Sequence, residues 1–211
     1  MIELVTTDGI FRLDGGEWEV TNNIWLIGDD REVVVVDAAH DATPIVQAVN
    51  GRRVAAIALT HGHNDHINAA VALQDAVDAP ILLHPDDRML WDEVYPEQDP
   101  DLDLIDGEIL RGGVAELGVL HTPGHSPGGC CLVLADGGVA SGQHVFSGDT
   151  LFCGGPGATG RSFSDFPTIV ESIRARLLTL PPETVVHTGH GDTTTIGQEA
   201  PDVEEWLRRG H

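Results

Sequence analysis

The chain contains no lysine. All eleven of its basic residues are arginines, they stand against 34 acidic residues, and the formal net charge at pH 7 is −23. A nucleic-acid-binding surface has to be basic in order to displace counterions from phosphates, and anionic membrane faces also attract basic segments. We therefore expect neither nucleic acid nor a membrane to be a partner. The missing lysine also leaves no ammonium group to hold an anionic substrate.

Cysteine and long apolar runs are scarce as well. The three cysteines, Cys130, Cys131 and Cys153, are an odd number without a CxxC spacing, which argues against a disulfide framework and a cysteine-rich zinc site. No apolar run approaches the roughly 18 residues of a membrane span. The N-terminus has no basic segment before an apolar stretch, so we expect no secretory signal and a cytoplasmic protein.

The 211 residues, 41% of them hydrophobic, can form one domain with a sizeable core. No repeat, linker or low-complexity segment divides them, so we expect a single domain over residues 1–211. Hydrophobic patterning predicts strands at 23–27, 32–37, 54–59, 81–83, 114–120, 130–134, 144–147 and 185–186. It predicts helices at 42–49, 68–77, 85–94, 167–180 and 203–209. This alternation is typical of an α/β domain with helices outside the sheets.

A dense group of metal-ligand residue types follows the expected strand at 54–59. His61, His63, Asp65 and His66 occupy four of six consecutive positions. Neutral imidazoles suit zinc or iron, and a carboxylate compensates part of the ion's charge. Gly62 leaves room for a tight loop between the first two histidines. The segment therefore predicts a metal site at the end of this strand.

Three further candidates lie at later strand-to-loop junctions, each beside a glycine. His125 follows the expected strand at 114–120, Asp149 follows 144–147 and His190 follows 185–186. Loops carried by a rigid scaffold are common places for functional residues. A site for two metal ions needs more ligands than one segment offers, and these three positions can supply them.

The ordered motifs HxHxDH, TPGHSPG, GDTLF and GHG resemble those of the metallo-β-lactamase superfamily, over nearly the whole chain. The GDTLF and TTTIG segments are most similar to its glyoxalase II-like branch. With few residues after His190 and a loop at 153–162 that departs from the usual GxxGR type, the chain looks similar to short glyoxalase II-like proteins of bacteria that use mycothiol. The resemblance implies an αββα four-layer sandwich, in which two sheets pack together and helices cover both outer faces.

The resemblance also implies a ligand set for two divalent metal ions, with zinc expected and iron or manganese as alternatives. His61, His63 and His125 would bind the first ion, and Asp65, His66 and His190 the second. Asp149 would bridge the two ions. Asp65 and Asp149 would also take part in catalysis. Asp37 resembles an aspartate that braces the metal loop; capping a turn is the alternative role.

The implied reaction is hydrolysis of a thioester of a low-molecular-weight thiol by a hydroxide held between the two metal ions. About twenty residues follow His190 and the chain has one tyrosine, so the helical domain with which glyoxalase II proper holds glutathione is not expected. A mycothiol thioester is therefore the candidate substrate. Arg161 is a candidate for holding a substrate carboxylate, with a structural role in its loop as the alternative.

Two other activities stay open. A mononuclear iron persulfide dioxygenase shares the fold and most of the motifs, and it would leave open coordination positions for oxygen. A β-lactamase-like or lactone hydrolase is the other interpretation. The complete set of seven ligand residues argues against a non-catalytic relative.

Overall fold

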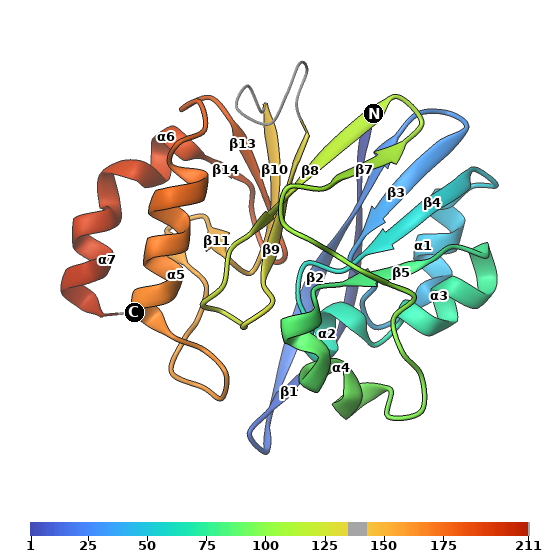
Figure 1. The fold of residues 1–211 in the computed structure, drawn as a ribbon, viewed down its shortest axis with the longest axis horizontal. Helices are drawn as coiled ribbons and strands as arrows, with labels where there is room; N and C mark the ends of the chain where they lie inside the picture. Colours follow the sequence, from blue (N-terminus) through green and yellow to red (C-terminus); the bar gives the residue numbers. More distant parts are fainter. Residues whose placement is uncertain (135–142, 211) are drawn as a thin grey trace.

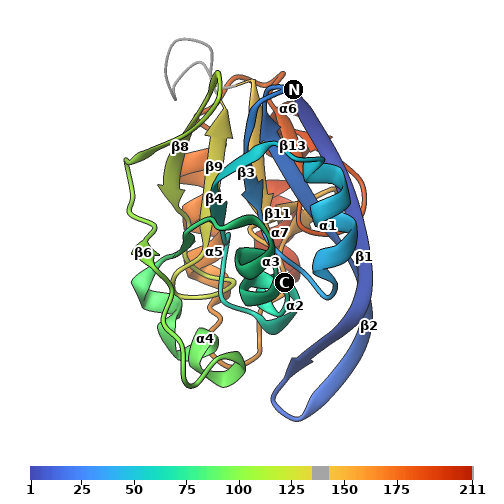
Figure 2. The same cartoon turned by 90° about the vertical axis from the view of Figure 1, so that its right-hand side faces the viewer.

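Four consecutive valines, Val33 to Val36, form most of strand β3 (Glu32–Val36) and are buried on both faces of their sheet. Because side chains alternate along a strand, Val33 and Val35 pack toward helices, whereas Val34 and Val36 pack toward a second sheet. The computed structural model describes residues 1–134 and 143–210. Its two sheets lie face to face, with helices on each outer side (Figures 1 and 2).

The first sheet has the strand order β1-β2-β3-β4-β5-β6. Strands β1 to β3 are antiparallel, and β3 to β6 are parallel and joined by connections that carry helices. The other strands of this sheet are β1 (Ile2–Leu13), β2 (Gly16–Gly28), β4 (Arg53–Ala58), β5 (Ile81–Leu83) and β6 (Leu102–Asp103). The helices on this side are α1 (Ala42–Val49), α2 (Asn64–Ile67), α3 (Ala70–Val77) and α4 (Arg88–Val94), with a 3-10 turn at Pro85–Asp87.

The second sheet has the order β14-β13-β10-β9-β8-β7, in which only the β10–β13 pair is parallel. Its strands are β7 (Ile109–Gly112), β8 (Ala115–His121), β9 (Cys130–Leu134), β10 (His144–Gly148), β13 (Val185–Thr188) and β14 (Thr194–Thr195). A small hairpin is formed by β11 (Leu151–Phe152) and β12 (Gly155–Pro156). The helices are α5 (Phe166–Ser172), which continues as a π-helical turn over Ile173–Leu177, α6 (Ile196–Glu199), a 3-10 turn at Ala200–Asp202 and α7 (Val203–Arg209).

Three hydrophobic cores separate the four layers. The first lies between the first sheet and its helices, the second between the two sheets, and the third between the second sheet and α5 and α7. Trp91, Phe146 and Trp206 are nearly inaccessible in the first, second and third cores, respectively. The predicted α/β fold, an αββα sandwich, is confirmed. Over residues 1–134 and 143–210, no helix has the length and apolar character needed to cross a membrane.

Several predicted elements differ from the structure in their bounds, and two of these differences concern segments around the site. The long hairpin of β1 and β2 was predicted only at its end, residues 23–27, whereas it runs from Ile2 to Gly28. The helix predicted over 68–77 begins at Ala70 as α3, and a separate short helix, α2, precedes it. The backbone of Ala38 lies between the two helices: its amide donates to the carbonyl of His66 and its carbonyl accepts from the amide of Ala69. Helix α2 starts at Asn64, inside the histidine-rich motif.

Candidate metal centre

The seven histidine and aspartate side chains of the four motifs meet at one edge of the two sheets. The loop after β4 carries His61 and His63, helix α2 carries Asp65 and His66, and the turn between β8 and β9 carries His125. The residues after β10 and β13 supply two more side chains, Asp149 and His190. Because β4, β10 and β13 end at this same edge, the loops that follow them converge although they are up to 129 residues apart in sequence.

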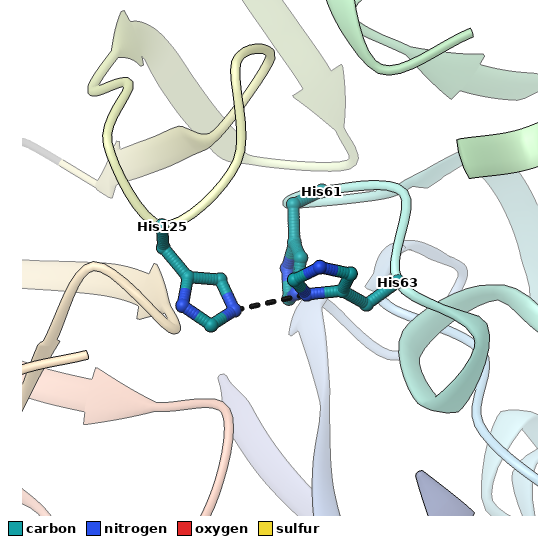
Figure 3. A group of neighbouring side chains, drawn as sticks. All are labelled: His61, His63 and His125. Carbon is teal, nitrogen blue, oxygen red and sulfur yellow. Dashed lines mark hydrogen bonds between the residues drawn. The ribbon is translucent and has the colours of Figure 1, made fainter. Parts of the chain in front are cut away.

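The first group consists of three histidines whose ring nitrogens lie within 4.8 Å of one another. Nδ1 of His63 is 3.0 Å from Nε2 of His125. The ring centroids of His61 lie 4.8 Å from those of His63 and 4.9 Å from those of His125. All three rings are buried, and they face one another across a small space (Figure 3).

The second group consists of Asp65, His66 and His190. Nε2 of His190 lies 3.2 Å from Nε2 of His66 and 3.3 Å from Oδ2 of Asp65. Asp65 and His66 are buried, and His190 is partly accessible. Each residue of this group therefore directs a nitrogen or oxygen donor toward a common centre.

Asp149 lies between the two groups. Its Oδ1 is 3.2 Å from Nε2 of His66 in the second group, and its Oδ2 is 3.5 Å from Nε2 of His125 in the first. Oδ2 is also 3.6 Å from Nε2 of His190. One carboxylate thus contacts both groups, which is the position the resemblance implied for a bridging ligand.

The donor set fits two metal ions. Donor atoms bound to one tetrahedral zinc ion, at about 2.0–2.1 Å, lie about 3.3 Å from one another, and the contacts above span 3.0–3.6 Å. Nε2 of His61 in the first group and Oδ1 of Asp149 between the groups are buried without a hydrogen-bond partner among the described residues. Buried polar atoms without partners are costly, and a cation at each group would engage donors of this kind.

Electrostatics at His61, His63 and Asp149 favour the protonation states that bind metal, whereas, despite burial, the carboxylate of Asp149 raises the pKa of His66 and of His190. Burial and the neighbouring His125 lower the pKa of His63 to about 3, and burial with His66 holds the pKa of His61 well below its ordinary value. Although burial opposes it, His66 and His190 hold the pKa of Asp149 well below that of a free carboxyl. Neutral imidazole and ionised carboxylate are the forms that ligate a metal ion.

The outward ring nitrogens of several histidines are held by acceptors, which aims the other nitrogen at the centre. Nδ1 of His125 lies 2.8 Å from the carbonyl oxygen of Ala158, and Nδ1 of His190 lies 2.8 Å from that of Thr21. Nδ1 of His66 lies 2.8 Å from Oδ2 of Asp37. These contacts leave Nε2 of each ring directed inward.

Asp37 lies at the end of β3, where the sequence analysis expects a brace for the metal loop. Its Oδ1 accepts a hydrogen bond from the amide of Thr60 at 2.7 Å, and its Oδ2 accepts one from the hydroxyl of Thr60 at 2.9 Å. Together with the contact to His66, these bonds link the end of β3 to both ends of the 60–66 loop. The carboxylate is buried, so solvent does not compete with these bonds.

A second aspartate that the sequence analysis missed joins two metal loops. Asp87 is inaccessible to solvent, and its Oδ2 accepts hydrogen bonds from the amide of Gly62 at 2.8 Å and the hydroxyl of Ser126 at 2.7 Å. Its Oδ1 accepts one from the amide of Gly128. A Cβ atom on either glycine would come within 3 Å of Asp87. The local sequence indicates only a carboxylate in a helix's first turn, so nothing in it reveals this role.

The β1–β2 hairpin also supports the centre, again without a signal in the sequence. Nδ2 of Asn22 donates to Oδ2 of Asp65 at 3.2 Å. Nδ2 of the next residue, Asn23, donates to the carbonyl oxygens of Thr188 and Gly191 at 3.1 and 2.9 Å, on either side of His190. Part of the hairpin therefore holds the second group in place.

A pocket of about 370 Å³ opens beside the centre. Its floor is formed by four of the candidate ligands: Asp65, His125, Asp149 and His190. Its walls are Phe11, Val20 and Thr21 of the hairpin, and Phe152 and Ala158 of the segment that follows β10. The volume lies within the usual range of small-molecule sites.

Arg161, the candidate for binding a substrate carboxylate, does not line this pocket. Its guanidinium carbon lies 4.0 Å from the ring centroid of Trp18 in β2, a cation–π distance. The next residue, Ser162, donates from its amide and its hydroxyl to the carboxylate of Asp14 at the hairpin tip. The structure therefore places Arg161 in a contact between its loop and the hairpin.

A separate group of potential ligands, His84, Asp86 and His121, lies outside the centre. The two rings stack with centroids 4.1 Å apart and planes 10° from parallel. Nδ1 of His84 accepts from the amide of Asp86, and Nε2 of His121 lies 2.9 Å from the carbonyl oxygen of Pro127. These contacts engage Nδ1 of His84 and Nε2 of His121 within the protein.

Comparison with known proteins gives consistent matches. The family model described as the metallo-beta-lactamase superfamily matches residues 18–190. Hydroxyacylglutathione hydrolase GloC of Haemophilus influenzae is 33% identical over 192 residues, covering 83% of this chain and 87% of that protein. The probable metallo-hydrolase YqgX of Bacillus subtilis is 35% identical over 190 residues, covering 83% and 87%. The crystal structure of TTHA1623 in a di-iron-bound form is 34% identical, with a TM-score of 0.72, and the match covers 86% of this chain and 93% of that one.

Proposed function

This chain belongs to the metallo-β-lactamase superfamily, and on that basis we propose that it hydrolyses thioesters of a low-molecular-weight thiol with the help of two metal ions. The observation that carries the proposal is the position of Asp149, whose carboxylate contacts both histidine groups beside an open pocket. The similarity to GloC, named as a hydroxyacylglutathione hydrolase, supports thioesters as the substrate class.

We propose zinc as the metal, because imidazole nitrogens and carboxylate oxygens are common zinc ligands. His61, His63 and His125 would hold one ion, Asp65, His66 and His190 the other, and Asp149 both. Iron is the main alternative, since the similar protein TTHA1623 has been solved with two iron ions. Such ions, when bound, polarise a carbonyl oxygen and lower the pKa of water toward neutrality.

The protein's own side chains contribute by orienting the attacking water molecule and by accepting its proton. Despite burial, the neighbouring His66 lowers the pKa of Asp65, so this carboxylate is ionised near neutral pH. The bond from Asn22 holds one of its oxygens at the floor of the pocket. Asp65 can therefore orient a water molecule, take up its proton as the water attacks the thioester carbonyl, and give that proton to the thiolate that leaves when the C–S bond breaks.

No protein nucleophile is required in this scheme. Burial holds the pKa of Cys130 well above its ordinary value and raises that of Cys131 to about 11, which leaves both thiols protonated and unreactive. Direct attack by water is consistent with a pocket whose floor consists of the candidate metal ligands.

Our proposal for the thiol carrier of the substrate rests on the charges of the protein and of the candidate carriers. Glutathione carries two carboxylates, whereas mycothiol carries none, and the pocket is lined by no arginine while the chain has no lysine. An anionic carrier would approach a protein of net charge −23 without a cationic side chain at the pocket to receive it. A mycothiol thioester is therefore our proposed substrate.

Metal analysis combined with substrate assays tests the proposal. Protein purified without added metal should contain about two metal ions per chain and should cleave mycothiol thioesters faster than the matching glutathione thioesters. Oxygen uptake with glutathione persulfide, at one iron per chain and without thioester cleavage, would instead indicate a persulfide dioxygenase. Cleavage of β-lactams or lactones in preference to thioesters would also contradict the proposal.

A further inference from the structure

The pocket beside the centre has walls of one chemical kind. Phe11 and Val20 project from the β1–β2 hairpin, and Phe152 and Ala158 project from the opposite segment, which begins with β11. Thr21 is the one polar residue of these walls. Walls that are largely apolar favour an uncharged, apolar group of a ligand.

The wall residues contact the candidate metal ligands directly. The ring centroid of Phe11 lies 5.3 Å from that of His63, and the ring centroid of Phe152 lies 6.2 Å from that of His190. The carbonyl of Ala158 accepts from His125, as described above. The part of the acyl chain next to the reacting carbonyl would therefore contact these wall residues.

The hairpin wall is held in place by the metal loop. Asn64 accepts a hydrogen bond from the amide of Arg12 at 2.7 Å and donates one to the carbonyl of Ile10 at 2.9 Å. These two bonds flank Phe11, whose ring also packs against Trp18 at 5.5 Å between centroids. A preformed wall loses less conformational entropy when a ligand binds.

Cations near the walls have partners elsewhere. Arg161 stacks on Trp18, and Arg12 pairs with Glu17 at 2.8 Å. No arginine lines the pocket. A carboxylate at the end of the acyl group away from the metal centre would lose water among Phe11, Val20 and Phe152 without a cationic side chain to pair with, which is unfavourable.

We infer that this pocket receives the acyl group of the substrate and selects short, uncharged acyl chains over chains that end in a carboxylate. The inference rests on the proposed thioesterase function. Its specificity-determining residues are Phe11, Val20 and Phe152. The volume of about 370 Å³ has room for a four-carbon acyl group, and each methylene that the walls bury should raise kcat/KM about fourfold.

The test compares thioesters that share one thiol carrier and differ only in the acyl group. Butyryl and succinyl thioesters have the same four-carbon chain and differ by a terminal carboxylate. With the metal-loaded protein, kcat/KM should be at least tenfold higher for the butyryl than for the succinyl compound, and higher for butyryl than for acetyl. Equal or higher values for the succinyl compound would overturn the inference.

Two variants assign the selectivity to the walls. Val20→Arg places a cation in the wall and should raise the succinyl-to-butyryl ratio of kcat/KM at least fivefold. Val114→Arg makes the same change at a residue 81% exposed and outside the pocket, and it should leave the ratio unchanged. Phe152→Ala should reduce the preference for butyryl over acetyl. An unchanged ratio in Val20→Arg would show that the wall does not select.

Uncleavable ketone analogues of the butyryl and succinyl thioesters separate failure of the inference from failure of the proposed function. Rapid hydrolysis of both thioesters with equal affinity for both ketones would overturn the inference and leave the function standing. Absence of hydrolysis with tighter binding of the butyryl ketone would overturn the function and support the apolar pocket. Calorimetry of the folded, metal-loaded protein provides the affinities.

Discussion

The carboxylate of Asp87 accepts a hydrogen bond from the amide of Gly62, which lies between two of the candidate metal ligands. The same carboxylate binds Ser126 and Gly128, on the loop that carries His125. One buried side chain outside the ligand set thus couples the geometry of two ligand loops. Burial raises the pKa of Asp87, and its three donors supply the hydrogen bonds that the buried carboxylate needs.

Replacement of Asp87 should therefore affect both stability and metal binding. Asp87→Ala leaves three buried donors without an acceptor, at roughly 1–3 kcal/mol for each buried group left unpaired. We expect a clear fall in the free energy of unfolding and weaker metal binding, measured by denaturant titration and metal analysis. Asp86→Ala, at a neighbouring carboxylate 60% exposed, is the matched control and should change both little. Normal metal content in folded Asp87→Ala would contradict the proposed coupling.

Removal of Asp149 should be the most damaging single change in the centre. Because its carboxylate contacts both histidine groups, Asp149→Ala should abolish thioester hydrolysis and lower the metal content from about two ions per chain toward one or none. Metal analysis and a thioester assay measure the two effects. Asp202→Ala, at an exposed position, controls for loss of one negative charge. Full activity in Asp149→Ala would exclude a bridging role.

Asp37 should act on metal binding through His66. Asp37→Asn keeps the shape of the side chain but removes its charge, and loss of such a partner costs about 10–100-fold in metal affinity or activity. Competition with a chelator would measure the affinity. Asp41→Asn is a suitable control, because Asp41 caps α1 at an exposed position and is not part of the centre. If both variants release metal equally, the contact between Asp37 and His66 does not orient a ligand.

His187 should make stability depend on acidity. Burial, reinforced by His144, lowers its pKa to about 4, below the ordinary value near 6.5. Between these pH values the unfolded chain binds more protons at this residue than the folded chain, so its contribution is present above pH 6.5 and is lost as the pH falls toward 4. The loss amounts to at most about 3 kcal/mol. His187→Phe preserves a ring beside Phe146 and should flatten this part of the stability profile.

The measurement for His187 uses metal-free protein, so that protonation of the metal ligands does not change the metal content during the titration. Denaturant unfolding at a series of pH values between 4 and 7 gives the slope for both proteins. Equal slopes for the parent and His187→Phe would show that another group governs this pH range.

Most of the sandwich could be predicted because its strands carry their own signal. The run of Val33 to Val36 indicates a strand buried on both faces, and the helix at 42–49 and the strand at 81–83 have the bounds that periodicity predicts. Strand β1 escaped prediction because its side chains are mostly half-exposed and show no clear alternation. Asp14 and Gly15, both with positive φ at its tip, are a turn signal that could have identified this hairpin.

The amino-acid sequence alone determined which side chains could bind metal, because each candidate belongs to a recognisable motif that follows a strand. Only the tertiary structure decided which residues form hydrogen bonds to the ligand loops and which residues line the pocket beside the ligands. Asp87 reaches Gly62 from 25 positions away, and Asn23 reaches Thr188 from 165 positions away. The apolar wall opposite Phe152 likewise comes from the N-terminal hairpin. Contacts of this kind follow from how two sheets pack together, and no local pattern of residues specifies that packing.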